Sequence, residues 1–325
     1  MNTTQKKVLA ILAESRGESV SGEELAVRLG VSRAAVWKAI EGLRAQGHGI
    51  EAATNRGYRL DADSDVLCRE TVLPYLKSQV ELLTPRDVNS TNTYLRELAL
   101  QGAAHGTVAL ADKQSAGRGR RGRAFLSPAG GIYLSVLLRP AMSARRGVRL
   151  TIAACVGVCR ALHTVCGIEA GIKWVNDLFV DGKKVCGILT EAATSLESGM
   201  LDYAVVGVGL NYLWPEAGFP PELKDIAGSL YGPGERPSAS RGMMAAALID
   251  SLMEALSDPE DEKIMEEYQA RSIVAGKHVL VLRGDSRRPA LAEAVLEDGC
   301  LRVRYEDGSM ENLCSGEVSI LPERE

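Results

Sequence analysis

"GIKWVNDLFVDGKKVCGILTEA", residues 171–192, is the stretch that decides the fold class of the central part of the chain. Two runs rich in apolar residues flank the dipeptide Asp181-Gly182. An Asp-Gly dipeptide in this setting is a strong signal for a β-hairpin, because both residues tolerate the positive φ angles of a tight turn. A hairpin pairs its strands antiparallel. We therefore predict an α/β domain with a mixed or antiparallel sheet rather than strict strand–helix–strand repeats.

The neighbouring segments extend this alternation of strands and helices over residues 80–272. The stretch 84–102 reads as a strand end, a turn and a helix. Strands are expected within 106–114, 131–140 and 201–212, and helices within 147–166, 241–256 and 260–271. The sequence thus predicts one domain of about 190 residues, which is long enough for a core of its own.

Residues 1–62 predict a winged helix-turn-helix domain. The apolar residues of 6–14 share one face of a first helix. A second helix is bounded by a capping box of Ser21 and Glu24 and by Gly30. A third helix starts after Ser32, carries its apolar residues at i, i+4 and i+7, and is expected to end at Gly47. The short joint between the second and third helices is typical of the helix-turn-helix motif.

The third helix and a hairpin predicted within residues 50–60 would form the DNA-reading surface. Arg33 and Lys38 can reach phosphates or a guanine edge, and a small residue at 34 lets the helix sit deep in the major groove. A winged helix that binds a protein partner instead of DNA is the alternative, and Trp37 could pack in the core. The predicted DNA-binding residues are Ser32, Arg33, Ala34, Trp37 and Lys38 on the helix and Arg56 on the wing.

Charge is distributed unevenly along the chain. Residues 1–60 contain 9 Lys and Arg against 6 Asp and Glu, a net charge of +3, whereas the remainder has 29 against 36, a net charge of −7. The hydrophobic content of 46% and charged content of 25% are ordinary for a globular protein. A mildly basic head on an acidic body indicates a small nucleic-acid module joined to something else.

Cysteine and histidine usage favours a reducing compartment and no metal site. The seven cysteines are odd in number and contain no C-x-x-C pair, so a disulfide framework is not expected. Cysteines 155, 159 and 166 read as small buried hydrophobes on a helix, and the four histidines lack zinc-binding spacing. We found neither a signal-peptide pattern nor an apolar run that we judged long enough to span a bilayer, so we expect a cytoplasmic protein without membrane contact.

Residues 117–123, "GRGRRGR", combine three glycines with four arginines. The segment formally matches G-x-G-x-x-G, but Pro128, two glycines and another predicted strand follow it where a dinucleotide-binding fold needs a helix. A P-loop motif is also absent from the sequence. Arginines on a glycine backbone suit bidentate binding of phosphate or carboxylate, and their mutual repulsion predicts disorder until an anion binds. An RNA-binding patch of the RGG type is the alternative.

Lys184 and Asp177 form a second candidate constellation. Lys184 is the second of two lysines after the tight turn and leads into an apolar strand, so its ammonium can be held beside a buried pocket. Asp177 lies across the same hairpin and is close enough to pair with it. The alternative is an ordinary surface ion pair, which contributes little to stability.

At these residues the chain resembles the biotin protein ligases, and the leading winged helix indicates the bifunctional type that is also a biotin operon repressor. The resemblance covers the whole chain. It implies activation of biotin with MgATP to biotinyl-5′-adenylate and transfer of biotin to one lysine of a biotin carboxyl carrier protein domain. The matching motifs are S-T-N at 90–92, Q-S-A-G-R-G-R-R-G-R at 114–123, K-W-V-N-D at 173–177, K-K-V-C-G-I-L at 183–189 and G-V-G-L-N at 207–211.

The resemblance assigns roles to residues of this sequence. Arg118 and Lys184 would be catalytic cations at the reacting carboxylate and phosphate, and Asp177 would orient or receive a proton in the transfer step. Ser90 or Thr91 could instead simply cap a helix. The implied biotin- and adenylate-binding residues are Ser90, Thr91, Asn92, Gln114, Gly117, Arg118, Gly119, Arg120, Phe125, Lys184, Gly187, Gly207, Gly209 and Asn211.

The resemblance also implies an architecture and a set of partners. The expected parts are a winged helix over 1–62, a linker and lead-in helix over 63–79, a catalytic domain like those of class II synthetases over 80–272, and an SH3-like β-barrel over 273–325. The cofactors would be ATP, Mg²⁺ without dedicated protein ligands, and biotin, with biotinyl-5′-AMP as corepressor. The partners would be the carrier domain, operator DNA and a second copy of the chain in a ligand-promoted homodimer.

Three residues depart from the family pattern. Val175 stands where proline is usual, Phe125 stands where tryptophan is common, and Trp37 stands where a polar base-reading residue is expected. Two other functions remain open at this point. One is a DNA-binding regulator that only senses the ligand, and the other is a ligase for a related acid such as lipoate.

Overall fold

The computed structural model describes residues 1–15, 17–53, 56–61, 64–85, 87–195, 197–237, 239–283 and 286–321. The chain divides into two compact units. The first comprises Met1–Gln79 and Pro237–Asp250, and the second comprises Val80–Arg236 and Ser251–Glu325.

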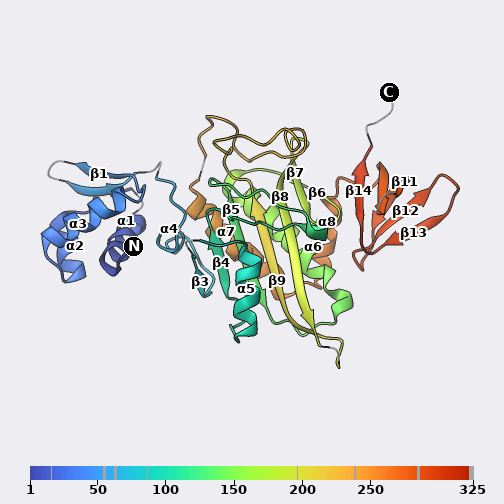
Figure 1. Ribbon diagram of the computed structural model, residues 1–325, viewed down its shortest axis with the longest axis horizontal. Helices are drawn as coiled ribbons and strands as arrows, with labels where there is room; N and C mark the ends of the chain where they lie inside the picture. Colours follow the sequence, from blue (N-terminus) through green and yellow to red (C-terminus); the bar gives the residue numbers. More distant parts are fainter. Residues whose placement is uncertain are drawn as a thin grey trace. The chain divides into compact units, whose positions relative to one another are not determined.

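The first unit contains the expected helix-turn-helix elements and wing (Figure 1). Ser21 Oγ accepts the N–H of Glu24 at 3.0 Å, and Ser32 Oγ accepts the N–H of Ala35 at 3.2 Å, so both predicted caps are confirmed. The third helix ends earlier than predicted, before Gly47. The elements are α1 (Thr3–Glu14), α2 (Gly22–Leu29), α3 (Arg33–Arg44), β1 (Ile50–Ala53) and β2 (Gly57–Leu60).

A compact apolar core explains why these short helices fold together. Leu9, Leu12, Leu25, Ile40 and Leu43 are all fully buried and belong to one cluster. The wing is an antiparallel pair in which Ile50 faces Leu60, as predicted. Residues 54 and 55, which include the predicted tip at Asn55, lie outside the described residues.

The segment after the wing is held against the start of a late helix. This segment contains the short helix α4 (Arg69–Val72), and the late helix is α7 (Arg241–Ser257). Asp65 accepts the backbone N–H of Arg241 at 2.9 Å and also pairs with its guanidinium. The backbone N–H of Ser78 donates to Asp250 at 2.7 Å. The predicted lead-in helix therefore exists, although it is only four residues long.

The second unit is built on a seven-stranded sheet with the order β3-β4-β5-β9-β8-β7-β6. Among the described strands, β3 and β4 are parallel and the other neighbours are antiparallel, so the predicted mixed sheet is confirmed. The strands are β3 (Leu82–Leu83), β4 (Val108–Ala111), β5 (Ile132–Leu138), β6 (Gly171–Lys173), β7 (Asp177–Val180), β8 (Lys183–Thr194) and β9 (Leu201–Leu210).

The hairpin that decided the fold class joins β7 to β8. Asp181 and Gly182 at its turn have φ angles of 48° and 74°, the positive values that the dipeptide was expected to supply. The run 171–180 is itself divided into β6 and β7, which pair antiparallel. A second reversal of the chain therefore precedes the predicted one.

Helices cover both faces of this sheet. The helix α5 (Thr91–Leu100) packs Leu95 and Ala99 against Leu137 and Val205. The helices α6 (Val148–Cys166) and α8 (Glu262–Ala270) pack on one another, and α6 contacts the opposite face. Successive residues of β8 point to opposite faces of the sheet. Thr190 contacts Thr151 of α6, and the next residue, Glu191, contacts Asn92 of α5.

The helix α6 corrects one expectation and confirms another. Residues Ala144–Cys166 are long and apolar enough to cross a membrane, so our prediction that no apolar run has this length was wrong. However, 72% of the apolar window is buried inside the protein, as in the core helix of a globular domain. Cys155 and Cys159 are fully buried on this helix, as predicted for small core hydrophobes.

The C-terminal residues form a five-stranded antiparallel sheet with the order β13-β12-β11-β10-β14. Among the described residues the sheet is open, since β13 and β14 lie at its two edges and do not pair with each other. This open sheet does not confirm the SH3-like β-barrel expected over 273–325. The strands are β10 (His278–Arg283), β11 (Ser286–Val295), β12 (Leu301–Tyr305), β13 (Met310–Leu313) and β14 (Glu317–Ile320).

A disulfide between Cys300 and Cys314 contradicts the expectation of free thiols for this pair. The expectation came from the odd cysteine count and ignored strand pairing. Leu301 on β12 faces Leu313 on β13, so the residues one step beyond this pair, at 300 and 314, also face one another. The other five cysteines are free.

Candidate active site

A cavity of about 400 Å³ lies on the face of the large sheet that carries α5. Residues far apart in the sequence meet around it, including the residue before α5, the Gly/Arg loop, the β7–β8 hairpin, the end of β9 and strand β14. Side chains alternate between the two faces of a strand, so residues 187, 189 and 191 on β8 and residues 207 and 209 on β9 share the face of the sheet on which the cavity lies. The cavity therefore collects nearly every motif that the sequence analysis selected.

Two glycines leave room for an aromatic ring on the cavity floor. A Cβ atom at Gly209 would lie 2.5 Å from the Phe125 ring, and one at Gly187 would lie 3.0 Å from it. The Gly187 position would also lie 3.3 Å from Cε of Lys184, so the absence of a side chain there lets the lysine stem cross the strand. At both positions a side chain would collide with the Phe125 ring, so glycine is needed for its close approach to the sheet.

Lys184 and Asp177 form the predicted ion pair. Nζ of Lys184 lies 2.7 Å from Oδ1 of Asp177, and each side chain is about a quarter exposed. The Lys184 backbone is also clamped, since its N–H donates to the carbonyl of Ile226 and its carbonyl accepts the N–H of Gly228. The ammonium is therefore held at one place beside the cavity.

The position of Asp177 does not depend on a proline before Asn176. Val175 occupies the position where the family usually has proline, and the peptide bond between Trp174 and Val175 is cis. The hydroxyl of Tyr268 donates to the carbonyl of Val175 at 3.1 Å. The side-chain nitrogen of Asn176 donates to the carbonyl of Ile188 at 2.7 Å. These contacts and the pairing of β6 with β7 hold the turn.

Lys173 is a second lysine of the site, and the sequence analysis did not select it. It lies at the end of β6 and lines the cavity. Burial lowers the pKa of its ammonium, the carboxylate of Asp177 opposes this effect, and the charge of Lys184 adds to it. The K-W-V-N-D motif had already placed it four residues from Asp177, and the β6–β7 pairing brings the two residues face to face.

The Gly/Arg loop has one described conformation, in which three of its arginines have partners. Nη2 of Arg118 lies 3.2 Å from Glu191, Nη1 of Arg120 donates to Asn176 at 3.1 Å, and Nη2 of Arg123 lies 2.6 Å from Glu317. We predicted a disordered loop because of repulsion among the arginines. In this conformation carboxylates and an amide of the chain offset that repulsion.

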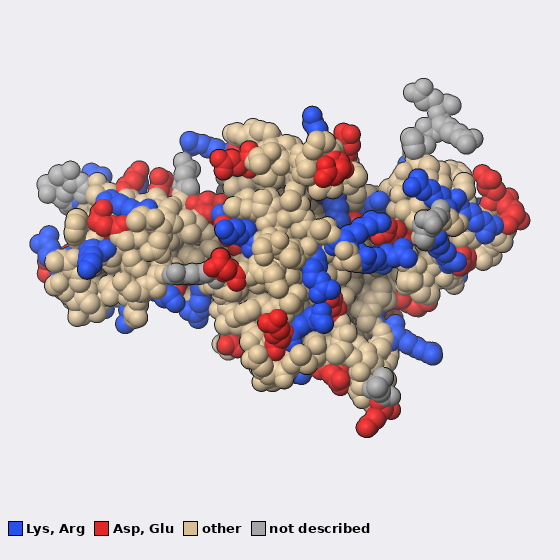
Figure 2. Space-filling view, in the orientation of Figure 1, with Lys and Arg blue, Asp and Glu red and all other residues tan. Residues whose placement is uncertain are grey.

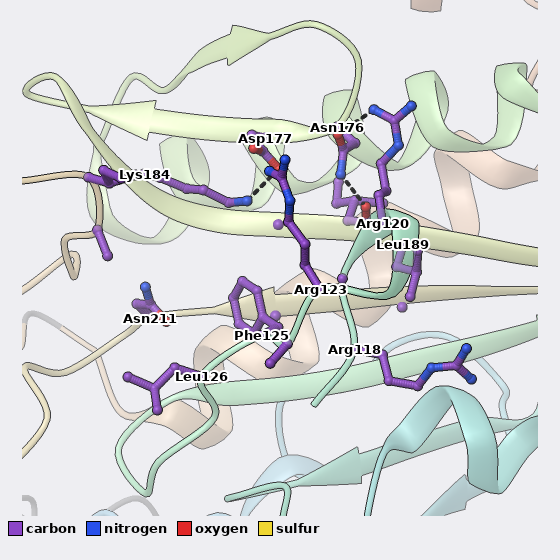
Figure 3. A pocket seen from close by; sticks show the side chains of 18 of the residues that line it. Arg118, Arg120, Arg123, Phe125, Leu126, Asn176, Asp177, Lys184, Leu189 and Asn211 are labelled. Atoms are coloured by element: carbon purple, nitrogen blue, oxygen red, sulfur yellow. Dashed lines mark hydrogen bonds and ion pairs between the residues drawn. The ribbon is translucent and has the colours of Figure 1, made fainter. Parts of the chain in front are cut away.

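The arginines point in different directions (Figure 3). Arg123 lies beside Asp177, Arg120 reaches Asn176, and Arg118 points away from both towards the other side of the cavity. Lys and Arg side chains also gather between the central sheet and the C-terminal strands on the face shown in Figure 2. The cavity is thus surrounded by positive charge, and its arginines do not converge on one point.

Glu191 and Glu317 are functional candidates that sequence reasoning missed. Glu191 is on β8 and contacts Arg118, Arg96 and Asn92, and Glu317 is on β14 and contacts Arg123. Both side chains are about four-fifths buried. Alternation along β8 from Gly187 could have placed Glu191 on the cavity face, whereas no sequence signal linked Glu317 to the loop.

The predicted ligand-binding residues are nearly all brought together. Gly117 alone is absent from the lining, and a Cβ there would lie 2.3 Å from both Ser127 Oγ and the carbonyl oxygen of Phe125. Asn211 lines the cavity, but its side chain donates to the carbonyl of Gly228 at 2.9 Å. The predicted residues that line the cavity are Ser90, Thr91, Asn92, Gln114, Arg118, Gly119, Arg120, Phe125, Asp177, Lys184, Gly187, Gly207, Gly209 and Asn211.

The predicted DNA-binding residues lie on the surface of the first unit. Ser32 caps α3, whereas Ala34, Lys38 and Arg56 are exposed. Trp37 is 59% exposed, so the alternative that it packs in the core is wrong. Arg33 is exposed and its guanidinium lies 3.6 Å from the carboxylate of Glu23.

Potential metal ligands of the part of the chain that the structure describes do not gather in the cavity. Among the described residues, one group of three such side chains lies close together, formed by Asp298, Cys300 and Cys314. None of the three lines the cavity. The carboxylates at the cavity, those of Asp177 and Glu317, are paired with Lys184 and Arg123.

Two family descriptions match the chain. Residues 83–211 match the biotin/lipoate A/B protein ligase family, and residues 4–59 match a helix-turn-helix domain. The first match contains most of the cavity-lining residues, and the second spans α1 to β2.

Similar proteins cover most of the chain. The bifunctional ligase/repressor BirA of Bacillus spizizenii is 38% identical over 233 residues, which is 70% of this chain and 71% of that protein. BirA of Escherichia coli is 28% identical over 98% of both chains. The structure of a biotin protein ligase from Aquifex aeolicus in complex with biotin and ATP matches 75% of this chain and 99% of that one, with a TM-score of 0.61 and 28% identity.

We expect Lys173→Met to raise the free energy of unfolding at neutral pH. The folded-state pKa of Lys173 lies below its ordinary value of 10.5. Between these two values the unfolded chain binds more protons at this group, so stability rises with pH through that window. Below the window the desolvation penalty is fully present, and methionine removes it. Urea unfolding from pH 7 to 11 should show a gain that shrinks as the pH rises.

The exposed lysine at 113 offers a matched control. Lys113→Met removes the same charge without a buried ammonium, and should leave the wild-type dependence of unfolding on pH unchanged. A Lys173→Met protein less stable than the wild type at pH 7 would contradict the assigned penalty.

Proposed function

Because the chain belongs to the biotin protein ligase family, in its bifunctional ligase/repressor form, we propose that the cavity binds biotin and ATP and joins them. The enzyme forms biotinyl-5′-AMP and transfers biotin to a lysine of a biotin carboxyl carrier protein domain. The observation that supports this assignment best is the cavity itself, where Lys184 and the arginines of the Gly/Arg loop surround a floor of glycines.

In the first step an oxygen of the biotin carboxylate attacks the α-phosphorus of ATP. A new oxygen–phosphorus bond forms, and the bond to the β-phosphate breaks as pyrophosphate leaves. The carboxylate is already ionised at neutral pH, so this step requires no base. The obstacle is repulsion between two anions, which fixed cations offset in a site that excludes water. Lys184, Arg118 and Arg120 are placed to supply this charge.

When the substrates bind, the cations of the site would exchange their carboxylate partners within the protein for oxygens of the substrates. Arg118 would leave Glu191 for the reacting carboxylate and phosphate, and Lys184 would turn from Asp177 to the same oxygens. Arginine suits this exchange because its planar guanidinium binds carboxylate and phosphate equally well in a bidentate manner.

The remaining lining residues divide the cavity between the two substrates. Ser90, Thr91, Asn92 and Gln114 gather at one part of the cavity and would bind the ureido ring of biotin. Phe125 would stack on adenine with a smaller face than tryptophan offers, and Asn211 lies on the nucleotide side. Mg²⁺ would arrive with ATP, held mainly by phosphate oxygens, and would neutralise part of their charge.

In the second step the acceptor lysine must lose a proton before its nitrogen attacks the adenylate carbonyl. The free pKa of lysine is about 10.4, so a base that accepts the proton accelerates the reaction. Once Lys184 contacts the phosphate, the carboxylate of Asp177 becomes available for this role. The nitrogen–carbon bond forms and AMP leaves.

We expect Asp177→Asn to lower the rate of biotin transfer to the carrier by about 100-fold, the usual contribution of a positioned general base. Adenylate formation should stay within a few-fold of wild type, because the first step uses no base. Single-turnover transfer from preformed biotinyl-AMP separates the two steps.

Asp181→Asn is the matched control, because Asp181 lies in the hairpin turn four residues away and asparagine tolerates its positive φ. This variant should transfer biotin at the wild-type rate. Transfer by Asp177→Asn at that same rate would remove the proposed role of Asp177.

The first unit gives the enzyme its second activity as a repressor of biotin synthesis genes. We propose that α3 enters the major groove of operator DNA, that Arg33 and Lys38 contact phosphates or bases there, and that Arg56 contacts the backbone from the wing. A homodimer promoted by biotinyl-5′-AMP would match two operator half-sites. We further propose the four-part domain division described above, an SH3-like barrel for residues 273–325 that contacts the carrier, and a cytoplasmic location.

The repressor proposal predicts coupling between the two units. Biotin plus MgATP should tighten operator binding by at least tenfold in an electrophoretic mobility assay with the wild-type protein. Operator affinity that stays the same with and without these ligands would contradict a ligand-promoted dimer.

A further inference from the structure

Trp37 presents a large apolar surface to solvent on α3. It is 59% exposed, whereas Val36 and Ile40 on the same helix are buried. A single exposed apolar side chain is common on a protein surface, so the position of Trp37 on the helix decides whether it is functional.

Trp37 lies within the exposed face of α3, between two cations. Arg33 is one turn before it at i−4, Ala34 is at i−3, and Lys38 is the next residue, and all three are exposed. The first 60 residues contain 9 Lys and Arg against 6 Asp and Glu. Duplex DNA, a polyanion, complements the charge of this face and would cover the indole at the same time.

The end of α3 is fixed to the wing. Nε and Nη2 of Arg44 donate to the carbonyl of Ile50 at the start of β1, at 2.9 and 2.7 Å. Glu41 is one turn after Trp37, and its carboxylate lies 2.7 Å from Arg44, which offsets a charge that would repel DNA phosphates. The helix and the wing therefore approach DNA as one preformed surface.

The chemistry of the indole selects one of the four bases. Its ring is apolar, and its one polar group, Nε1–H, donates a hydrogen bond and cannot accept one. In the major groove thymine presents a methyl group beside the acceptor O4, cytosine presents the donor N4–H₂, and the purines present no methyl group. Opposite cytosine the indole N–H would face another donor. Opposite a purine the apolar ring would remove polar groups from water without replacing their hydrogen bonds.

We propose that Trp37 is a specificity-determining residue that reads thymine in the major groove of the operator. Its ring packs against the 5-methyl group, and its Nε1–H donates to O4 of the same base. Lys38, beside the indole, contacts a phosphate and strengthens binding to any sequence. The inference rests on the proposed repressor function and deepens it, because it names the base that α3 selects.

The test begins with selection of duplexes from a random-sequence pool by the full-length protein with biotin and MgATP. Each thymine of the selected duplex is then replaced in turn. Deoxyuridine removes the methyl group, and 5-methylcytosine paired with guanine keeps the methyl group and puts a donor in place of O4. At the contacted thymine either replacement should weaken wild-type binding in a mobility-shift titration by about fivefold or more, the lower end of the cost of one mismatched base pair.

Variants assign this preference to the indole. Trp37→Ala should bind the thymine and deoxyuridine duplexes within twofold of one another. Lys38→Met should instead weaken all duplexes alike and reduce the dependence of affinity on salt, which Trp37→Ala should leave unchanged. Val27→Ala is the matched control, because Val27 on α2 is an apolar residue that is 73% exposed, and it should keep the wild-type preference.

Trp37→Phe separates the two contacts, since it keeps an apolar ring and removes the N–H donor. It should still distinguish thymine from deoxyuridine and should lose most of its discrimination against 5-methylcytosine. Unchanged discrimination against 5-methylcytosine in this variant would overturn the proposal, and this result decides the matter if Trp37→Ala does not fold.

Two other results would also overturn the proposal. One is wild-type affinity that no deoxyuridine replacement changes by more than twofold, and the other is a thymine preference that persists in Trp37→Ala. A wild-type protein that selects no duplex from the pool would instead refute the proposed repressor function.

Discussion

The cations around the cavity are paired with carboxylates of the protein itself. Lys184 contacts Asp177, Arg118 contacts Glu191, and Arg123 contacts Glu317. Unpaired charges crowded beside a partly buried cavity would repel one another and carry a desolvation cost. Internal carboxylates offset both effects and can be exchanged for a carboxylate and a phosphate of similar charge. Catalysis by charge neutralisation and order in the Gly/Arg loop thus depend on the same ion pairs.

The antiparallel sheet places these partners. The turn at Asp181 and Gly182 sets the register of β7 against β8, and alternation along β8 then directs residues 187 and 189 to the cavity and Glu191 to the same face of the sheet. Gly187 and Gly209 leave the space that Phe125 occupies. The geometry of the site is therefore a property of strand pairing as much as of its charged residues.

The hairpin, the helix caps and the mixed sheet could be predicted because each depends on residues adjacent in sequence. Alternation along β8 could also have placed Glu191 on the cavity face, but Glu317 could not be predicted, because its role depends on which strand lies beside the Gly/Arg loop and a single carboxylate on a strand carries no local signal. The disulfide between Cys300 and Cys314 was missed for the same reason, because β12–β13 pairing brings the cysteines together. The loop conformation also escaped prediction, since repulsion among arginines is visible in the sequence and their distant partners are not.

The most direct test of the account is a chromatographic assay for acyl-adenylate. Purified protein would be incubated with MgATP and biotin, with lipoate in a parallel reaction. The account predicts biotinyl-AMP and pyrophosphate from biotin and no adenylate from lipoate. Adenylate from lipoate alone would contradict the substrate assignment. The absence of adenylate from both acids would mean that the paired cations serve ligand sensing rather than catalysis.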